Sequence, residues 1–135
     1  MAIWLTLAAV LGLAAYVRLA PSDPARWHVA TEVTGPPGEV VAGEGRASLR
    51  FPGDGAALLA RLDAVALATP RTQRLAGSIQ EGRITWVTRS ALWGFPDYTT
   101  AEARPDGLHV QARLRFGRSD LGVNAARLAD WLSRL

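Results

Sequence analysis

The chain has 135 residues, of which 49% are hydrophobic and 20% are charged, and this suits one globular domain with an apolar addition. It contains no cysteine, which excludes a disulfide framework and a thiolate metal site. All 15 basic residues are arginine, and the formal net charge is +3.

An almost unbroken apolar run occupies residues 2–17. As a helix, these sixteen residues would be about 24 Å long, somewhat short of the roughly 30 Å bilayer core. Residues just beyond the run extend it if the Arg18 side chain snorkels, and Trp4 and Tyr16 suit the two membrane interfaces. We therefore predict that residues 1–20 form an uncleaved, single-span membrane anchor.

Two other interpretations of this run stay open, a buried core helix and a cleaved signal peptide. A helix that is apolar all round at the extreme N-terminus is rarely part of a core. Against cleavage, no charged side chain precedes the run and no clean small-x-small site precedes Arg18. The positive-inside rule alone would leave the domain in the cytoplasm. Because export signals begin near residue 2, however, we expect an extracytoplasmic domain.

Proline and glycine recur through residues 21–45 and exclude a regular element in the middle of this stretch. We interpret it as a tether between the anchor and the domain. Within it, residues 27–29 could lie on the membrane surface or dock on the domain. Residues 38–51 are expected to be extended around a turn at residues 43–45.

Residues 46–135 are predicted to form an α+β domain, an antiparallel β-sheet meander with two helices packed on one face. The first helix should begin after Asp54, an N-cap, and end at Thr69, because a residue before proline avoids the α region. Strands are expected near residues 74–80, 83–89, 97–103 and 108–116. The closing helix should carry Leu121, Leu128, Trp131, Leu132 and Leu135.

The last predicted strand, residues 108–116, alternates strictly between apolar and polar side chains. Its apolar positions and its basic or polar positions must therefore face opposite sides of the sheet. This alternation is typical of an antiparallel sheet that is covered on one side. After the strand, residues 117–122 break the pattern, and Ser119 or Asp120 could cap the following helix.

The run from Arg115 to Asn124, with Arg127 after it, resembles the signature of the family known as domain of unknown function 1499. Residues 69–72, 88–90 and 94–98 also resemble its members, so the likeness covers residues 46–135. Two positions depart, since Leu114 and Ala125 stand where the family often has serine and arginine. The resemblance implies a small α+β domain, often membrane-attached in bacteria, and hence a single-pass inner-membrane protein. It implies no known activity.

Motifs for catalysis or cofactor binding are largely missing from the sequence. His28 and His109 have no neighbour at metal-ligand spacing, and no P-loop, nucleophile elbow or dinucleotide fingerprint occurs. Asp97 and Asp120 could do acid–base work only if the fold brought them together. We expect neither an enzyme nor a cofactor.

Positive charge is concentrated in residues 71–135, which hold ten arginines against six acidic residues. The predicted anchor and the interspersed acids argue against nucleic acid as a partner. Anionic lipid headgroups suit a basic domain tethered to a bilayer, and the helix start after Gly117 could also bind an anion. We therefore predict an anionic-ligand or lipid-headgroup site on the arginine-rich sheet face. Its candidate residues are Arg89, Arg113, Arg115, Arg118, Ser119 and Arg127.

The alternative is a structural or protein-interaction domain at the membrane that has no small-molecule ligand. In that case the arginines stabilise the fold or form a solvated face, and Trp27 or Trp93 contacts a protein partner. We also predict a structural network of Asp97, Asp120 and Asn124, in which the two carboxylates could neutralise the arginines near the closing helix and leave no place for an anion.

Overall fold

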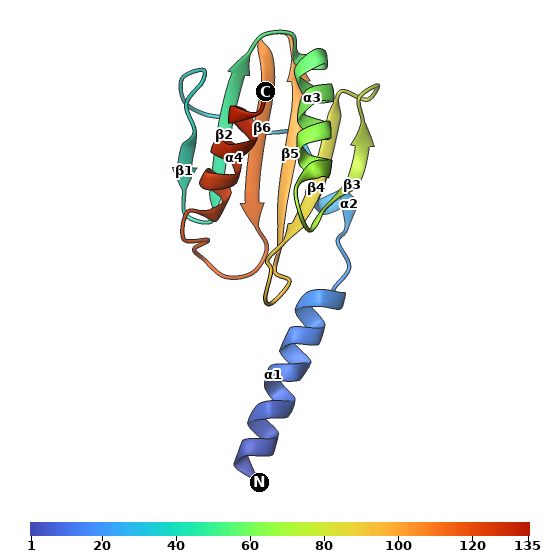
Figure 1. The fold of residues 1–135 in the computed structure, drawn as a ribbon, viewed down its shortest axis with the longest axis vertical. Helices are drawn as coiled ribbons and strands as arrows, with labels where there is room; N and C mark the ends of the chain where they lie inside the picture. Colours follow the sequence, from blue (N-terminus) through green and yellow to red (C-terminus); the bar gives the residue numbers. More distant parts are fainter.

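The computed structural model describes residues 1–135 and contains one six-stranded antiparallel sheet (Figure 1). Two helices lie on one face of the sheet, and a long N-terminal helix protrudes from one end, which confirms the predicted α+β architecture. The helices are α1 (Ala2–Leu19), α2 (Pro24–Trp27), α3 (Gly55–Ala68) and α4 (Val123–Ser133). The strands are β1 (Val41–Gly43), β2 (Arg46–Pro52), β3 (Thr72–Ser78), β4 (Arg83–Arg89), β5 (Pro96–Arg104) and β6 (Gly107–Leu114).

Strands β3 to β6 form the predicted meander, in which each strand pairs with the next. The β1–β2 hairpin adds to the β6 edge, with Leu49 opposite Val110, so the strand order is β1-β2-β6-β5-β4-β3. The connection from β2 to β3 runs through α3 and therefore crosses the sheet from one side to the other. The hairpin begins at Val41, ahead of the predicted domain boundary at residue 46.

Helix α3 begins and ends where its local sequence predicts. Its N-cap is Asp54, whose side chain accepts from the amides of Ala56 and Ala57 at 3.1 and 3.2 Å. The first residue of the helix must be small, because a Cβ added to Gly55 would lie 2.5 Å from the carbonyl oxygen of Gly107. The N-terminus of α3 is thereby packed directly onto the start of β6.

The core lies between the apolar sheet face and the two helices, and Trp86 of β4 is at its centre. This side chain is fully buried, and its ring meets that of Trp131 from α4 edge-on, with centroids 5.9 Å apart. Its indole N–H donates to Asp63 of α3 at 3.0 Å, and the same carboxylate pairs with Arg74. The Asp63 carboxylate thus satisfies the single polar atom of the central indole.

Helix α4 starts at Val123, later than the predicted caps at Ser119 and Asp120. Leu121 precedes the helix at φ 53 and its side chain is 93% exposed, so its predicted place on the helix's apolar face is wrong. Leu128 and Trp131 are buried, as the apolar pattern predicted. The turn before the helix uses two consecutive residues with positive φ, Leu121 and Gly122, rather than a single cap.

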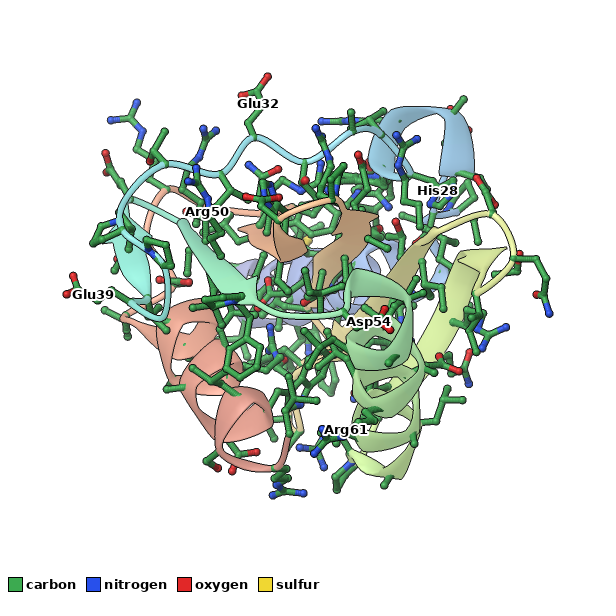
Figure 2. The ribbon with its side chains drawn as sticks, turned by 90° about the horizontal axis from the view of Figure 1, so that it is seen from above. His28, Glu32, Glu39, Arg50, Asp54 and Arg61 are labelled. Carbon is green, nitrogen blue, oxygen red and sulfur yellow. The ribbon has the colours of Figure 1, made fainter.

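The polar face of the sheet is also covered, which differs from the one-sided covering expected from the alternation in β6. Residues 20–40 run across it, opposite α3 and α4 (Figure 2). Trp27 is 7% exposed and stacks on Tyr98 with ring centroids 4.0 Å apart. Of the two possibilities for residues 27–29, the structure therefore shows docking on the domain.

This packing makes Trp27 a structural residue. Replacing it with alanine should lower the free energy of unfolding by about 3 kcal/mol, because a buried indole and its ring stack are lost. Denaturant unfolding of the full chain in detergent would measure this change, with Val29→Ala in the same segment as the control, since Val29 is exposed. Equal, small losses in the two variants would contradict a packed role for the segment.

Candidate functional site

The structure places the predicted ligand-site residues and the predicted structural network in two separate groups. Three arginines extend over the polar sheet face, where residues 20–40 lie: Arg89, Arg113 and Arg115. The others gather around the start of α4, on the helix face of the sheet: Asp97, Ser119, Asp120, Asn124 and Arg127. Arg118 lies exposed in the loop between β6 and α4 and forms no ion pair.

The three sheet-face arginines bind backbone carbonyls of the N-terminal segment rather than carboxylates. Arg89 donates to Val17 O at 3.3 Å, Arg113 to Trp27 O at 2.9 Å and Arg115 to Pro21 O at 2.9 Å. The acceptors lie between 72 and 94 residues away in the sequence. These guanidiniums therefore hold the N-terminal segment on the sheet, and donors that were predicted to face a ligand are used within the fold.

Tyr98 of β5 lies at the centre of this arrangement. Its hydroxyl is 2.7 Å from Ser22 Oγ and accepts a hydrogen bond from Arg115 at 3.1 Å, while its ring stacks against that of Trp27. Arg113 beside it also donates to Thr100 Oγ1 at 2.8 Å. Burial lowers the pKa of Arg113, and the neighbouring charge of Arg46 lowers it further. The cluster is a packed polar layer with a structural role.

At the start of α4 the carboxylate of Asp120 occupies the position that an anion would take. Its two oxygens accept from the backbone amides of Gly122 and Asn124, both at 3.0 Å. Ser119 Oγ accepts from the amide of Leu121 at 3.2 Å. These amides are therefore satisfied from within the chain. Arg115 lies over the opposite face of the sheet, so the predicted grouping of Arg115, Arg118 and Arg127 around this helix start is not assembled.

The fold does bring Asp97 and Asp120 to one place. Arg127 donates to Asp97 at 3.4 Å and to Asn124 Oδ1 at 2.7 Å, and both carboxylates line a cleft of about 330 Å³. Burial raises the pKa of Asp97 despite the Arg127 charge beside it, and the Asp120 charge adds to the rise. Burial also acts to raise the pKa of Asp120, but the amides of Asn124 and Gly122 outweigh it and the pKa is lowered.

This cleft is half apolar and does not suit an anion. Two carboxylates face one guanidinium across it, and five of its lining residues are apolar: Phe95, Leu114, Phe116, Leu121 and Val123. Ser90 on its rim accepts from the amide of Phe95 at 3.0 Å and has no base beside it. The two histidines are engaged elsewhere, His28 with Glu81 at 2.8 Å and His109 with Asp106 at 3.0 Å.

A second cleft, of about 360 Å³, lies where α1 meets the sheet. Three arginines from distant parts of the chain line it, Arg18 at the end of α1, Arg71 before β3 and Arg89 at the end of β4. Its other lining residues are uncharged: Gln73, Val87, Ser90, Ala91 and Gly94. None of the three arginines forms an ion pair, so this cleft has an uncompensated positive charge.

Backbone carbonyls hold these three guanidiniums in place. Arg18 donates to Leu92 O at 2.7 Å, Arg71 to Arg89 O at 3.0 Å and Arg89 to Gly94 O at 2.9 Å. Sequence reasoning named only Arg89 as a site residue, because Arg18 was interpreted solely as an interfacial residue of the anchor. Arg71 lies in residues 69–72, one of the stretches that resemble the family, and this resemblance is the sequence feature that could have identified it as a site residue.

The opposite pKa shifts of the two aspartates predict opposite effects of pH on stability. The folded pKa of Asp120 is depressed, so its contribution is full above about pH 4 and is lost as the pH falls through the folded pKa. At pH 7, Asp120→Asn should cost about 1 kcal/mol, and the deficit should shrink on acidification. The folded pKa of Asp97 is raised, so wild type should instead gain stability relative to Asp97→Asn as the pH falls through that pKa.

Unfolding free energies of wild type and both variants between pH 7 and about pH 3 would check this prediction. Parallel pH profiles for the two variants would contradict the distinct environments of the two carboxylates. Each variant serves as the control for the other, because both replace one aspartate with its neutral isostere.

A family model described as "Protein of unknown function (DUF1499)" matches residues 19–135. No curated protein and no solved structure matches the chain. The matched range contains the sheet, helices α2 to α4 and the segment that crosses the polar face. The chain belongs to the DUF1499 family of proteins of unknown function.

Proposed function

We propose that this protein is a membrane-anchored domain that binds a phosphate-bearing anionic lipid headgroup in the cleft formed by Arg18, Arg71 and Arg89. The observation that carries the proposal is the convergence of three unpaired guanidiniums at the end of an apolar helix. Guanidinium forks match phosphate oxygens, and a headgroup beside a membrane span lies at this level.

The anchor part of the proposal rests on α1. It is the single helix of the structure that is long and apolar enough to cross a membrane, and most of its side chains are exposed. A signal sequence would satisfy the same test. Retention is supported by Val17, which is buried and whose carbonyl accepts from Arg89, because cleavage near Arg18 would remove this contact.

The charge balance of the cleft supports an anionic occupant. Each guanidinium has five N–H donors, and the carbonyl bonds described above use only one or two of them. No acidic side chain lines the cleft, whereas Arg127 in the other cleft faces two carboxylates. A phosphate could therefore accept charge-assisted hydrogen bonds here without displacing an internal partner.

The backbone of Arg71 gives independent support. It has φ 57, in the left-handed region that glycine adopts readily and arginine adopts at a cost. A glycine there would relieve the strain, but it would remove one of the three charges. Strained non-glycine residues cluster at ligand sites and persist where the surrounding structure fixes them, as the hydrogen bonds between Arg71 and Arg89 do here.

A structural or protein-interaction role is the second candidate function. It is supported by the carbonyl contacts of Arg89, Arg113 and Arg115, because guanidiniums that bind carbonyls within the chain can stabilise the fold without a ligand. Under that function the basic cleft would have no preference among lipids, so headgroup selectivity separates the two candidates.

The mature protein should retain its anchor. Intact-mass measurement and N-terminal sequencing of protein recovered from the membrane fraction should show a chain that still contains residues 2–17. A soluble product that starts near Arg18 would identify the segment as a cleaved signal and remove the anchor from the proposal.

The headgroup site can be tested in neutral detergent micelles that contain the full chain. Titration with short-chain phosphatidylglycerol should show tighter binding than titration with phosphatidylcholine, and added salt should weaken it. The double variant Arg18→Gln, Arg71→Gln should lose affinity at least about tenfold, because two charge-assisted contacts are removed. Arg89 is left intact because it also holds Val17 and Gly94.

The matched control is Arg61→Gln. Arg61 is an exposed arginine of α3, and it points away from the sheet on the helix side of the domain (Figure 2). A parallel titration with inorganic phosphate shows whether the lipid or the phosphate alone is the ligand. Equal binding of the two lipids by wild type, or an effect of Arg61→Gln as large as that of the double variant, would refute the site.

A further inference from the structure

We propose that the end of the domain from which α1 emerges docks into the bilayer interface, with Leu92, Trp93 and Leu121 inserted among the lipids. This inference rests on the proposed membrane insertion of α1 and goes beyond the headgroup cleft. Its partner is the bilayer surface itself.

Exposed apolar side chains gather in two loops at this end of the domain. The β4–β5 loop presents Leu92 at 72% exposure and Trp93 at 46%, and the β6–α4 connection presents Leu121 at 93%. Both loops lie at the end of the sheet that α1 leaves, whereas the β3–β4 and β5–β6 turns lie at the far end (Figure 1). Large apolar residues concentrated at one pole of a domain mark an interaction surface.

The position of the β4–β5 loop along α1 determines how deeply the loop would enter the bilayer. Trp93 and Phe95 form an entirely apolar cavity of about 170 Å³ with α1 residues from Val10 to Val17. At 1.5 Å per residue, that part of the helix is about 10 Å long. A bilayer that surrounds α1 up to Arg18 therefore also reaches these two aromatic side chains. Tryptophan is the residue type that membrane interfaces favour.

Contacts between the loops and the helix fix this placement. Arg18 donates to Leu92 O at 2.7 Å, and the ring of Tyr16 meets that of Phe116 edge-on with centroids 6.0 Å apart. Phe116 in turn lies 6.4 Å from Phe95 between ring centroids. Both loops thus contact the last turns of α1, so insertion of this helix would place them at the membrane surface.

Leu121 adds a separate argument from backbone strain. It combines φ 53, which leucine rarely adopts, with a side chain that is almost fully exposed. Glycine or asparagine would serve the turn better in water. A strained leucine that points out of the protein is compensated when its side chain leaves water, and a lipid layer at this pole provides that environment.

The charges at the same pole fit a bilayer better than a protein partner. Arg18, Arg71 and Arg118 are exposed there and have no ion pair, which suits the phosphate layer above inserted apolar tips. A bilayer that holds α1 is adjacent to this surface without any further binding event. The two loops would then set the basic cleft at headgroup depth.

The lack of cysteine allows the depth of each position to be measured by single-cysteine labelling. The full chain would be reconstituted at one copy per nanodisc, with an environment-sensitive fluorophore on Leu92→Cys or Leu121→Cys. Ile79→Cys, an exposed apolar position in the β3–β4 turn at the far end, is the matched control. Leu11→Cys in α1 reports separately whether the anchor is inserted. Quenching by doxyl-labelled lipid and by aqueous iodide would be compared.

We expect lipid quenching at Leu92, Leu121 and Leu11, and iodide quenching at Ile79, in neutral as well as anionic nanodiscs. Lipid quenching at Leu11 with iodide quenching at Leu92 and Leu121 would overturn docking while the anchor stands. Iodide quenching at Leu11 as well would overturn the anchor and docking together. Protection of Leu92 and Leu121 from both quenchers would indicate a protein contact and also overturn the proposal. Headgroup selectivity of the cleft is a separate measurement, so its failure can be distinguished from each of these results.

Discussion

The rest of the structure depends on the hydrogen bonds between sheet arginines and the carbonyls of residues 17–27. A chain segment that crosses a sheet face without joining its ladder leaves carbonyl groups without ladder partners, and buried carbonyls need donors. Arg89, Arg113 and Arg115 supply them. Because these bonds begin at Val17, the last turn of α1 is fixed to the end of β4 rather than joined to it by a flexible linker.

Because of these bonds, the basic face of the sheet binds the N-terminal segment of the chain rather than a ligand. The alternation in β6 gives one face to the apolar core and the other to the N-terminal segment, so neither face is free for a ligand. Arginine suits the second face because its planar fork can donate in several directions at once. Arg113, for example, donates to both Trp27 O and Thr100 Oγ1. At the end of the sheet near α1, Arg18 and Arg71 join Arg89 in one cleft that no acidic side chain lines.

Local signals in the sequence predicted most of the domain. Asp54 and Pro70 mark the ends of α3, and alternation marks the strands. The predicted start of α4 is wrong because Ser119 and Asp120 are good caps, whereas the chain continues through Leu121 and Gly122 with positive φ.

No local signal in the sequence indicates the path of residues 20–40. This segment has the proline content of a linker, and its contacts span more than 70 residues. The Arg18, Arg71 and Arg89 cleft was missed for the same reason. The family match from residue 19 is consistent with the segment being part of the fold.

Fixing α1 to the sheet also limits where a ligand can act. Under the proposed function, an anchor whose last turn is held by Arg89 would keep the domain at the membrane, so the basic cleft would stay beside the end of the span. The nine residues of β5 extend about 30 Å away from that level. Groups at the far end, such as the Asp106–His109 pair, therefore lie well beyond the headgroups and, under the proposed function, can serve only partners in the aqueous phase. The apolar loops, the strained Leu121 and the arginines of the cleft all occur at the near pole, and the proposed bilayer contact would account for all three.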